Sequence, residues 1–192
     1  MARPPRCLEY EGPHHLTARG SNRQVIFRDD ADYQSFVARL AATGEARQWS
    51  CLAYCLMPNH VHLIVQAQPG AISAGMGALL GGHAQRFNHR HERSGHLFGE
   101  RFHHVPILND DQIHTALRYI ALNPVRAGLV HEPTDWPWSS HSALASQLIY
   151  PGALDVRALT QVVGAPDNDL TATRRALLKL VSETPATPGN AA

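Results

Sequence analysis

The chain has 192 residues, 44% of them hydrophobic, and its 17 basic and 16 acidic residues give a net charge of +1. That apolar content suffices for one buried core, and the charge balance excludes a general polycation. No stretch reaches the roughly 18 apolar residues of a membrane span, and the first residues lack the apolar segment of a signal peptide, so we expect a soluble intracellular protein with no membrane partner.

Three cysteines, Cys7, Cys51 and Cys55, are an odd number without C-x-x-C spacing. This pattern argues against a disulfide framework and against a structural zinc site. We expect reduced cysteines, with Cys51 and Cys55 packed inside a strand.

The chain opens with a predicted strand and a predicted helix. Residues 14–20 alternate between polar and apolar side chains and end in glycine, which is typical of a strand followed by a turn. Residues 29–46 begin with acids and carry apolar side chains at helical spacing, so they predict a helix that stops near Gly44.

A hairpin and a second helix follow. Residues 49–57 and 60–67 are apolar runs that predict two strands, and Pro58-Asn59 between them suits a tight turn. Residues 73–95 predict a helix, although the five glycines between positions 75 and 95 disfavour it.

The last predicted elements of the main fold are an extended segment and a third helix. Residues 95–108 look extended, with Pro106 at a sheet edge or a strand end. Residues 109 to about 123 predict a helix that opens on polar cap residues, and Pro124 and Gly128 mark its end.

This order of elements predicts an α+β fold. Hairpin-joined strands interleaved with helices imply an antiparallel ferredoxin-like sheet with helices packed on one face. We expect one domain over residues 1–148, a helical C-terminal extension over 149–183 and a disordered tail over 184–192. A phosphate-binding glycine loop and a dinucleotide fingerprint are absent from the sequence, so we expect no nucleotide cofactor.

His60 and His62 stand two residues apart in the apolar run "CLMPNHVHLIV". Side chains alternate along a strand, so both imidazoles share one face while Val61, Leu63 and Val65 face the helices. Two imidazoles on an uncovered face can bind one cation. In a chain with 13 histidines such a pair also arises by chance, so the alternative of one buried and one surface histidine stays open.

Tyr119 and Asn123 stand four residues apart and share one face of the third predicted helix. The amide oxygen of Asn123 suits a hard cation such as Mg²⁺ or Mn²⁺, and imidazole ligands shift the preference toward manganese. The set His60, His62 and Asn123 would leave coordination positions open for substrate oxygens. Spacing alone favours an ordinary half-buried helix tyrosine at position 119.

Residues 83–104 hold six of the 13 histidines and four arginines, against only two acids. They predict a local positive face that could follow a phosphate backbone. The alternatives are a solvated helix surface, or metal binding by the histidines in a storage or sensing role. The DNA-binding candidates in and beyond this segment are Arg86, Arg90, Arg93, Arg101, Arg23 and Arg126.

Four segments in consistent order resemble one known family. These segments are "HHLTARGSNRQVIF", "MPNHVHLIV", "RFNHRHERSGHLFGERF" and "RYIALNPVRAGLV". Together they resemble the REP-associated tyrosine transposases of the HUH superfamily of single-strand DNA nucleases. The resemblance covers residues 10 to about 145.

The resemblance implies a function and a site. It implies an HUH nuclease fold in which His60, His62 and Asn123 bind Mg²⁺ or Mn²⁺ and Tyr119 is the nucleophile. The implied reaction cleaves single-stranded DNA beside REP-type hairpins through a 5′-phosphotyrosine and can rejoin strands. A monomer associated with the nucleoid in the cytoplasm is then expected. The alternative is a domesticated protein that binds hairpin DNA without cleaving it.

Overall fold

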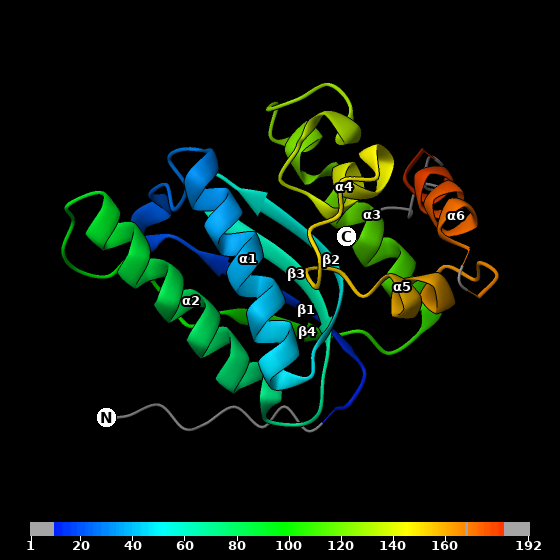
Figure 1. The fold of residues 1–192 in the computed structure, drawn as a ribbon, viewed down its shortest axis with the longest axis horizontal. Coiled ribbons are helices and arrows are strands. Elements are labelled where there is room, and N and C mark those ends of the chain that lie inside the picture. The colour runs from blue at the N-terminus through cyan, green and yellow to red at the C-terminus, as the bar shows by residue number, and fades with distance from the viewer. Residues whose placement is uncertain (1–9, 168, 183–192) are drawn as a thin grey trace, which may run out of the picture.

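The computed structural model describes residues 10–167 and 169–182, and its strands form one antiparallel sheet in the order β2-β3-β1-β4 (Figure 1). The strands are β1 (Pro13–Arg19), β2 (Ser50–Met57), β3 (His60–Gln66) and β4 (His103–Pro106). The helices are α1 (Asp30–Arg47), α2 (Ala71–Arg90), α3 (Asp110–Arg126), α4 (Ser140–Ser146), α5 (Val156–Val162) and α6 (Leu170–Ser182), with short 3-10 turns η1 (Ser21–Arg23) and η2 (Pro133–Asp135).

The β2-β3 hairpin forms as the sequence predicts. Met57 pairs with His60, so Pro58 and Asn59 alone make the turn. This short connection fixes the register of β3, and register decides which face of the sheet each β3 side chain occupies. The positions of both histidines therefore follow from the hairpin.

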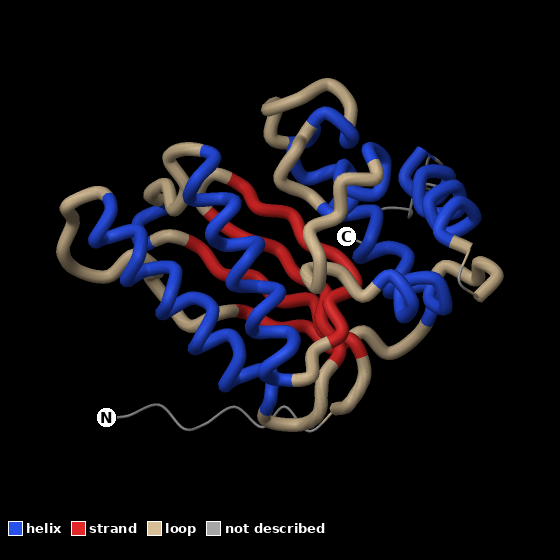
Figure 2. Tube along the Cα trace, viewed as in Figure 1, coloured by secondary structure: helices blue, strands red, loops and turns tan. Residues whose placement is uncertain are grey.

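Helices α1 and α2 lie side by side across one face of the sheet (Figure 2). The apolar side chains of β3 on this face are Val61, Leu63 and Val65, which are fully buried together with Leu16 of β1 and Phe36 of α1. The prediction that these three β3 residues face helices is confirmed.

The second face of the sheet is also partly covered, which the sequence did not predict. Helix α3 packs on β2 and β3 through Ile113, Leu117 and Ile120, which share a core with Ile64 of β3. Three buried side chains at this spacing form one apolar stripe, and such a stripe needs a partner surface. The antiparallel α+β class is confirmed, but helices occupy both faces rather than one.

Three helix ends differ from their predicted positions. Helix α1 continues past Gly44 to Arg47, and the left-handed residue that follows it is Gln48. Helix α3 continues past Pro124 to Arg126, because proline in the last turn keeps a helical φ and costs only the hydrogen bond that its missing N–H would donate. Gly128 follows with a left-handed φ of 67°, as expected of a residue just beyond a helix. Helix α2 ends at Arg90, five residues before the predicted end at position 95. Of the extended segment predicted at 95–108, only the four residues of β4 form a strand.

The C-terminal helices α5 and α6 contact each other. Helix α5 packs on β2 and helix α6 packs on α3, so both join the apolar core that α3 forms on the second face of the sheet. The Thr160 and Thr173 hydroxyls lie 2.8 Å apart and link the two helices in a buried position. The boundary between a domain of residues 1–148 and an extension stays a prediction, and the tail predicted at 184–192 lies outside the described residues. In the described part of the chain, we find no helix with the length and apolarity required to span a membrane.

Candidate active site on the second face of the sheet

The histidines of β3 lie together on the second face of the sheet. Their ring centroids are 4.9 Å apart, and the rings are nearly perpendicular. Cross-strand pairing sets His60 opposite Arg19 and His62 opposite Thr17 of β1. Opposite residues in a sheet point to the same side, so β1 adds polar side chains to the face that carries the imidazoles.

One ring nitrogen of each histidine is engaged. His60 Nδ1 lies 2.6 Å from Asn59 Oδ1, and Asn59 Nδ2 in turn donates to the carbonyl of Arg23. An amide oxygen only accepts, so the proton of His60 sits on Nδ1 and leaves a lone pair on Nε2. His62 Nδ1 lies 3.0 Å from His15 Nε2 and 3.2 Å from Thr17 Oγ1.

Both imidazoles are neutral at physiological pH. Burial lowers the pKa of His62 to about 3, with the nearby charges of His60, His15 and Arg19 acting in the same direction. Burial and the positive charge of Arg19 lower the pKa of His60 to about 4. A metal ligand must be the neutral imidazole, so these surroundings favour ligation over protonation.

Tyr119 reaches the same place from α3. The apolar stripe of α3 packs on β2 and β3. Tyr119 lies outside that stripe, beside the sheet, with 40% of its surface exposed. Its ring centroid lies 5.6 Å from that of His62 and 5.9 Å from that of His15. The Arg126 guanidinium lies over the Tyr119 ring, 5.3 Å from its centroid. The hydroxyl-bearing ring is therefore held by contacts on several sides.

Asn123 lines the same cavity as Tyr119 and the two β3 histidines, a hollow of about 1100 Å³. Its Nδ2 donates to the Tyr119 carbonyl at 3.2 Å, so Oδ1 is the atom that could bind a cation. No three His, Cys, Asp or Glu side chains among the described residues form a group that could hold a metal ion. If His60 and His62 bind a cation, a third protein ligand would be of another kind, and the Asn123 amide oxygen would suit Mg²⁺ or Mn²⁺.

Three of the six predicted DNA-binding arginines line this cavity: Arg23, Arg101 and Arg126. Arg19 of β1 joins them. The four guanidinium groups surround an opening in which Glu100 is the single carboxylate of the lining. Their planar forks match phosphate oxygens, so the cavity suits a polyanion.

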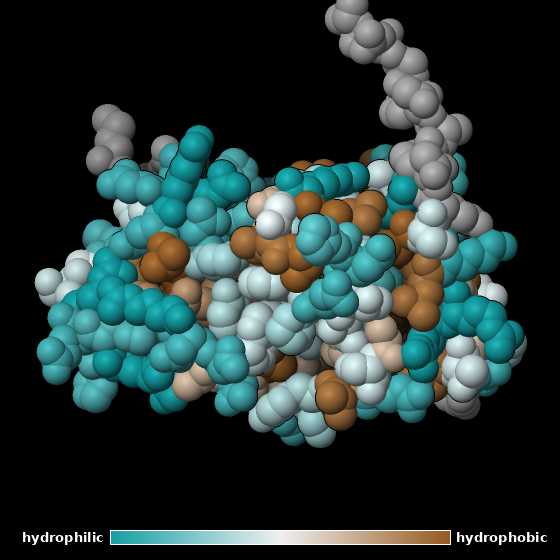
Figure 3. Space-filling model, turned by 90° about the horizontal axis from the view of Figure 1, so that it is seen from above, coloured by the Kyte–Doolittle hydropathy of each residue, from teal (hydrophilic) through white to brown (hydrophobic). Residues whose placement is uncertain are grey.

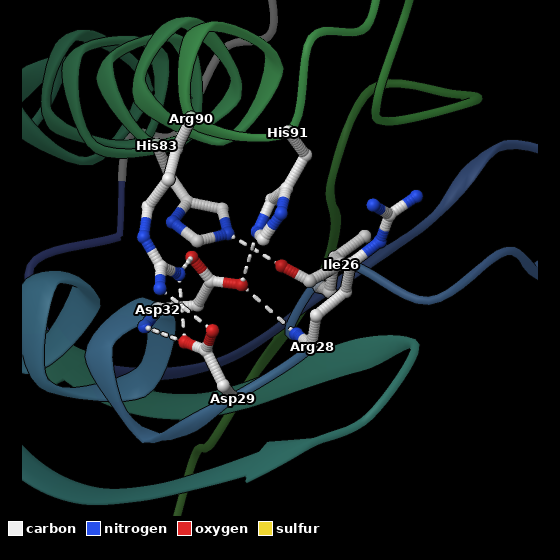
Figure 4. A network of polar contacts seen from close by, with 7 residues as sticks. All are labelled: Ile26, Arg28, Asp29, Asp32, His83, Arg90 and His91. Carbon is white, nitrogen blue, oxygen red and sulfur yellow. Dashed lines mark hydrogen bonds and ion pairs between the residues drawn. The ribbon is translucent and has the colours of Figure 1, made fainter.

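The other three arginines lie elsewhere. Arg90 donates to both Asp29 and Asp32 at 2.6 Å, and His91 donates to Asp32 at 2.8 Å (Figure 4). Arg93 donates to the Gln24 side chain at 2.5 Å, and Arg86 is exposed on α2. Arg90 is the least suited of the six to bind phosphate, because two carboxylates already occupy it.

The surface around these residues is nevertheless hydrophilic. Figure 3 shows polar side chains gathered at the end of the molecule where the chain leaves α2. The histidines of this segment do not converge there: His83 is buried and donates to the Ile26 carbonyl at 2.8 Å, while His91 binds Asp32. This arrangement does not support a histidine-rich metal store.

Sequence reasoning missed His15, Thr17 and Arg19 as members of the site. These three residues alternate along β1 and are all polar, a pattern that would have placed them on one face. Their position beside His60 and His62 depends on the pairing of β1 with β3, which the alternation within a single segment does not reveal.

Comparison with known proteins shows the family and supports the fold. A curated protein of Haemophilus influenzae that carries the name of a REP-associated tyrosine transposase is 27% identical over 132 residues, which cover 62% of this chain and 75% of that protein. A solved structure of a REP-associated tyrosine transposase bound to a REP hairpin superposes with a TM-score of 0.62 and 22% identity, covering 79% of this chain and 89% of the other. It shows a shared fold. Residues 10–123, more than half of the chain, match the family model of IS200-like transposases, and the chain belongs to that family.

Proposed function

We propose that this chain is a metal-dependent endonuclease and strand transferase that cleaves single-stranded DNA at hairpins through a 5′-phosphotyrosine on Tyr119. The observation that carries the proposal is the placement of Tyr119 against His62, with ring centroids 5.6 Å apart, in a cavity shared with His60 and Asn123. Helix and strand thereby meet at one point, as a nucleophile and a phosphate-activating group must.

In the proposed step, the Tyr119 oxygen attacks the scissile phosphorus. A tyrosyl oxygen–phosphorus bond forms while the bond to the 3′ oxygen breaks; the phenol proton is lost to water and the leaving oxygen gains one. Arg126, which lies over the ring, would orient it. A 3′-hydroxyl can reverse the step, which joins strands without a nucleotide cofactor.

The His60 and His62 imidazoles and the Asn123 amide would hold the divalent ion, Mg²⁺ or Mn²⁺. When bound, that ion would stabilise negative charge on the phosphate and on the leaving oxygen. In support of this assignment, His60, His62 and Asn123 all line one cavity. Asn59 would orient His60 for this role by accepting a hydrogen bond from its Nδ1–H.

We assign hairpin DNA of the REP type as the substrate, since the structurally similar transposase is bound to such a hairpin. Arg19, Arg23, Arg101 and Arg126 would contact phosphates of the strand entering the cavity. All catalytic groups of the proposed site come from a single chain, so a monomer suffices for cleavage.

The test uses end-labelled single-stranded hairpin DNA with Mn²⁺ or Mg²⁺ and denaturing gels that detect protein-linked DNA. The variant is Tyr119→Phe, which removes one oxygen. Tyr150→Phe is the matched control, because Tyr150 has a similar exposed fraction, 45% against 40%, and lies outside the cavity.

We expect wild type and Tyr150→Phe to form the covalent adduct and Tyr119→Phe to form none. An adduct that persists in Tyr119→Phe overturns the assignment of the nucleophile. Hairpin binding without an adduct, across several hairpins and both metals, favours instead the DNA-binding protein that does not cleave.

A further inference from the structure

His15 of β1 has all its closest polar and aromatic contacts within the proposed site. Its Nε2 lies 3.0 Å from His62 Nδ1, and the two ring centroids are 5.2 Å apart. Its ring also meets the Tyr119 ring edge to face, with centroids 5.9 Å apart. His15 thus touches both a metal-ligand candidate and the nucleophile candidate.

The contact with His15 determines which ring nitrogen of His62 is free to bind a cation. If His62 binds an ion through Nε2, its proton must sit on Nδ1, and Nδ1–H needs an acceptor. His15 Nε2 is the nearest candidate at 3.0 Å, and Thr17 Oγ1 is second at 3.2 Å. An acceptor in this position selects the metal-binding tautomer and fixes the rotation of the ring.

His15 is not needed to fill the hydrophobic core. It lies on the second face of β1, half-buried, between the large cavity and a smaller hollow of about 340 Å³ that also borders α3. Leu16, the next residue, is fully buried in the opposite core. The stability of β1 therefore depends mainly on the other face.

We propose that His15 is a positioning residue. Its Nε2 accepts a hydrogen bond from His62 Nδ1–H and so orients the His62 Nε2 lone pair toward a divalent cation. The proposal rests on the proposed function, since it assigns a role within the same site. The contact of His15 with Tyr119 would further align nucleophile and metal.

The test measures Mn²⁺ binding directly on the purified full chain without DNA, by titration followed with electron paramagnetic resonance. The variants are His15→Ala, which removes the acceptor, and His15→Gln, whose side-chain oxygen can occupy nearly the position of Nε2. His131→Ala is the control, because His131 is exposed and outside the cavity. Thermal unfolding of every variant checks that the fold is retained.

We expect His15→Ala to weaken Mn²⁺ binding about 10- to 100-fold, His15→Gln to restore most of it, and His131→Ala to match wild type. Equal Mn²⁺ affinity in His15→Ala and wild type overturns the positioning role while the metal site stands. Equal loss in His15→Ala and His15→Gln also overturns it, since then the ring alone matters rather than an acceptor.

Failure of the proposed function gives a different result. If wild type itself binds no Mn²⁺, or if His60→Ala binds as well as wild type, the metal site is wrong and the role of His15 falls with it.

Discussion

The two places where this chain concentrates histidine differ in how their histidines are used, although His103 of the richer segment also lines the cavity. Residues 83–104 hold the larger number, but His83 and His91 each donate to a neighbouring segment, to the Ile26 carbonyl and to Asp32. His60 and His62 are only two, yet both face one cavity with an unengaged lone pair on His60. Convergence on shared space, rather than local abundance, distinguishes the candidate site.

Two charged residues of the richer segment, Arg90 and His91, serve the fold. Asp32 of α1 is almost completely buried and accepts from the Arg28 backbone, Arg90 and His91 (Figure 4). Burial would raise the pKa of Asp32, but these hydrogen bonds outweigh it and lower the pKa. The hydrogen bond from Arg90 lowers the pKa of the exposed Asp29 to about 2. The network joins the start of α1 to the end of α2.

The largest expected effect is on DNA cleavage, and it comes from the pair His60 and His62. We expect His60→Ala or His62→Ala to reduce DNA cleavage more than about 100-fold, because each removes a ligand of the proposed metal site. Hairpin affinity, measured by fluorescence anisotropy, should stay within a few-fold of wild type. His89→Ala, on the exposed face of α2, is the control, and a similar cleavage loss there would break the contrast between the regions.

Next in size is the loss of Asp32. Asp32→Ala leaves Arg90 and His91 without their buried acceptor, so we expect the free energy of unfolding to fall by about 2–3 kcal/mol. Urea denaturation measures this change. Asp29→Ala should cost clearly less, since the Asp29 side chain is exposed to solvent. If both variants lost the same free energy of unfolding, the buried position of Asp32 would contribute nothing beyond that of an exposed carboxylate.

A smaller stability effect belongs to His83. His83→Leu introduces an apolar side chain of similar size but leaves the Ile26 carbonyl without its hydrogen-bond donor. We expect the free energy of unfolding at pH 7 to fall by about 1–2 kcal/mol. Urea denaturation of the variant and wild type at that pH checks the value.

His83 should also contribute to acid sensitivity. Burial lowers its pKa in the folded state, so the unfolded chain binds the proton more readily. Stability from this group is present above the ordinary histidine pKa near 6.5 and is lost as pH falls from there toward the folded pKa. We therefore expect His83→Leu to lose less stability than wild type between pH 7 and pH 5. An identical pH dependence would contradict the buried neutral state.

The smallest effect concerns phosphate contacts. We expect Arg23→Ala and Arg126→Ala each to reduce the dependence of log affinity on log salt by about 0.7 for single-stranded DNA. Arg90→Ala should leave that slope unchanged, because its guanidinium is held by Asp29 and Asp32. A reduced slope for Arg90→Ala would make the end of α2 a DNA surface as well.

The sequence predicted the parts of the site that lie within one element. Alternation placed His60 and His62 on one face, and helical spacing placed Tyr119 beside Asn123. It could not reveal that His15 would pair across to β3, or that Arg90 would meet Asp32, since both contacts join segments distant in the chain. The second helical layer was missed for the same reason.

The position of β1 has a consequence for synthesis. This strand is synthesised before its partner β3 and before the helix that carries Tyr119. Contacts between segments so far apart cannot form until the later segment is complete. A nascent chain therefore has no assembled cleavage site until α3 has left the ribosome, so the proposed nuclease would not cut DNA before that point.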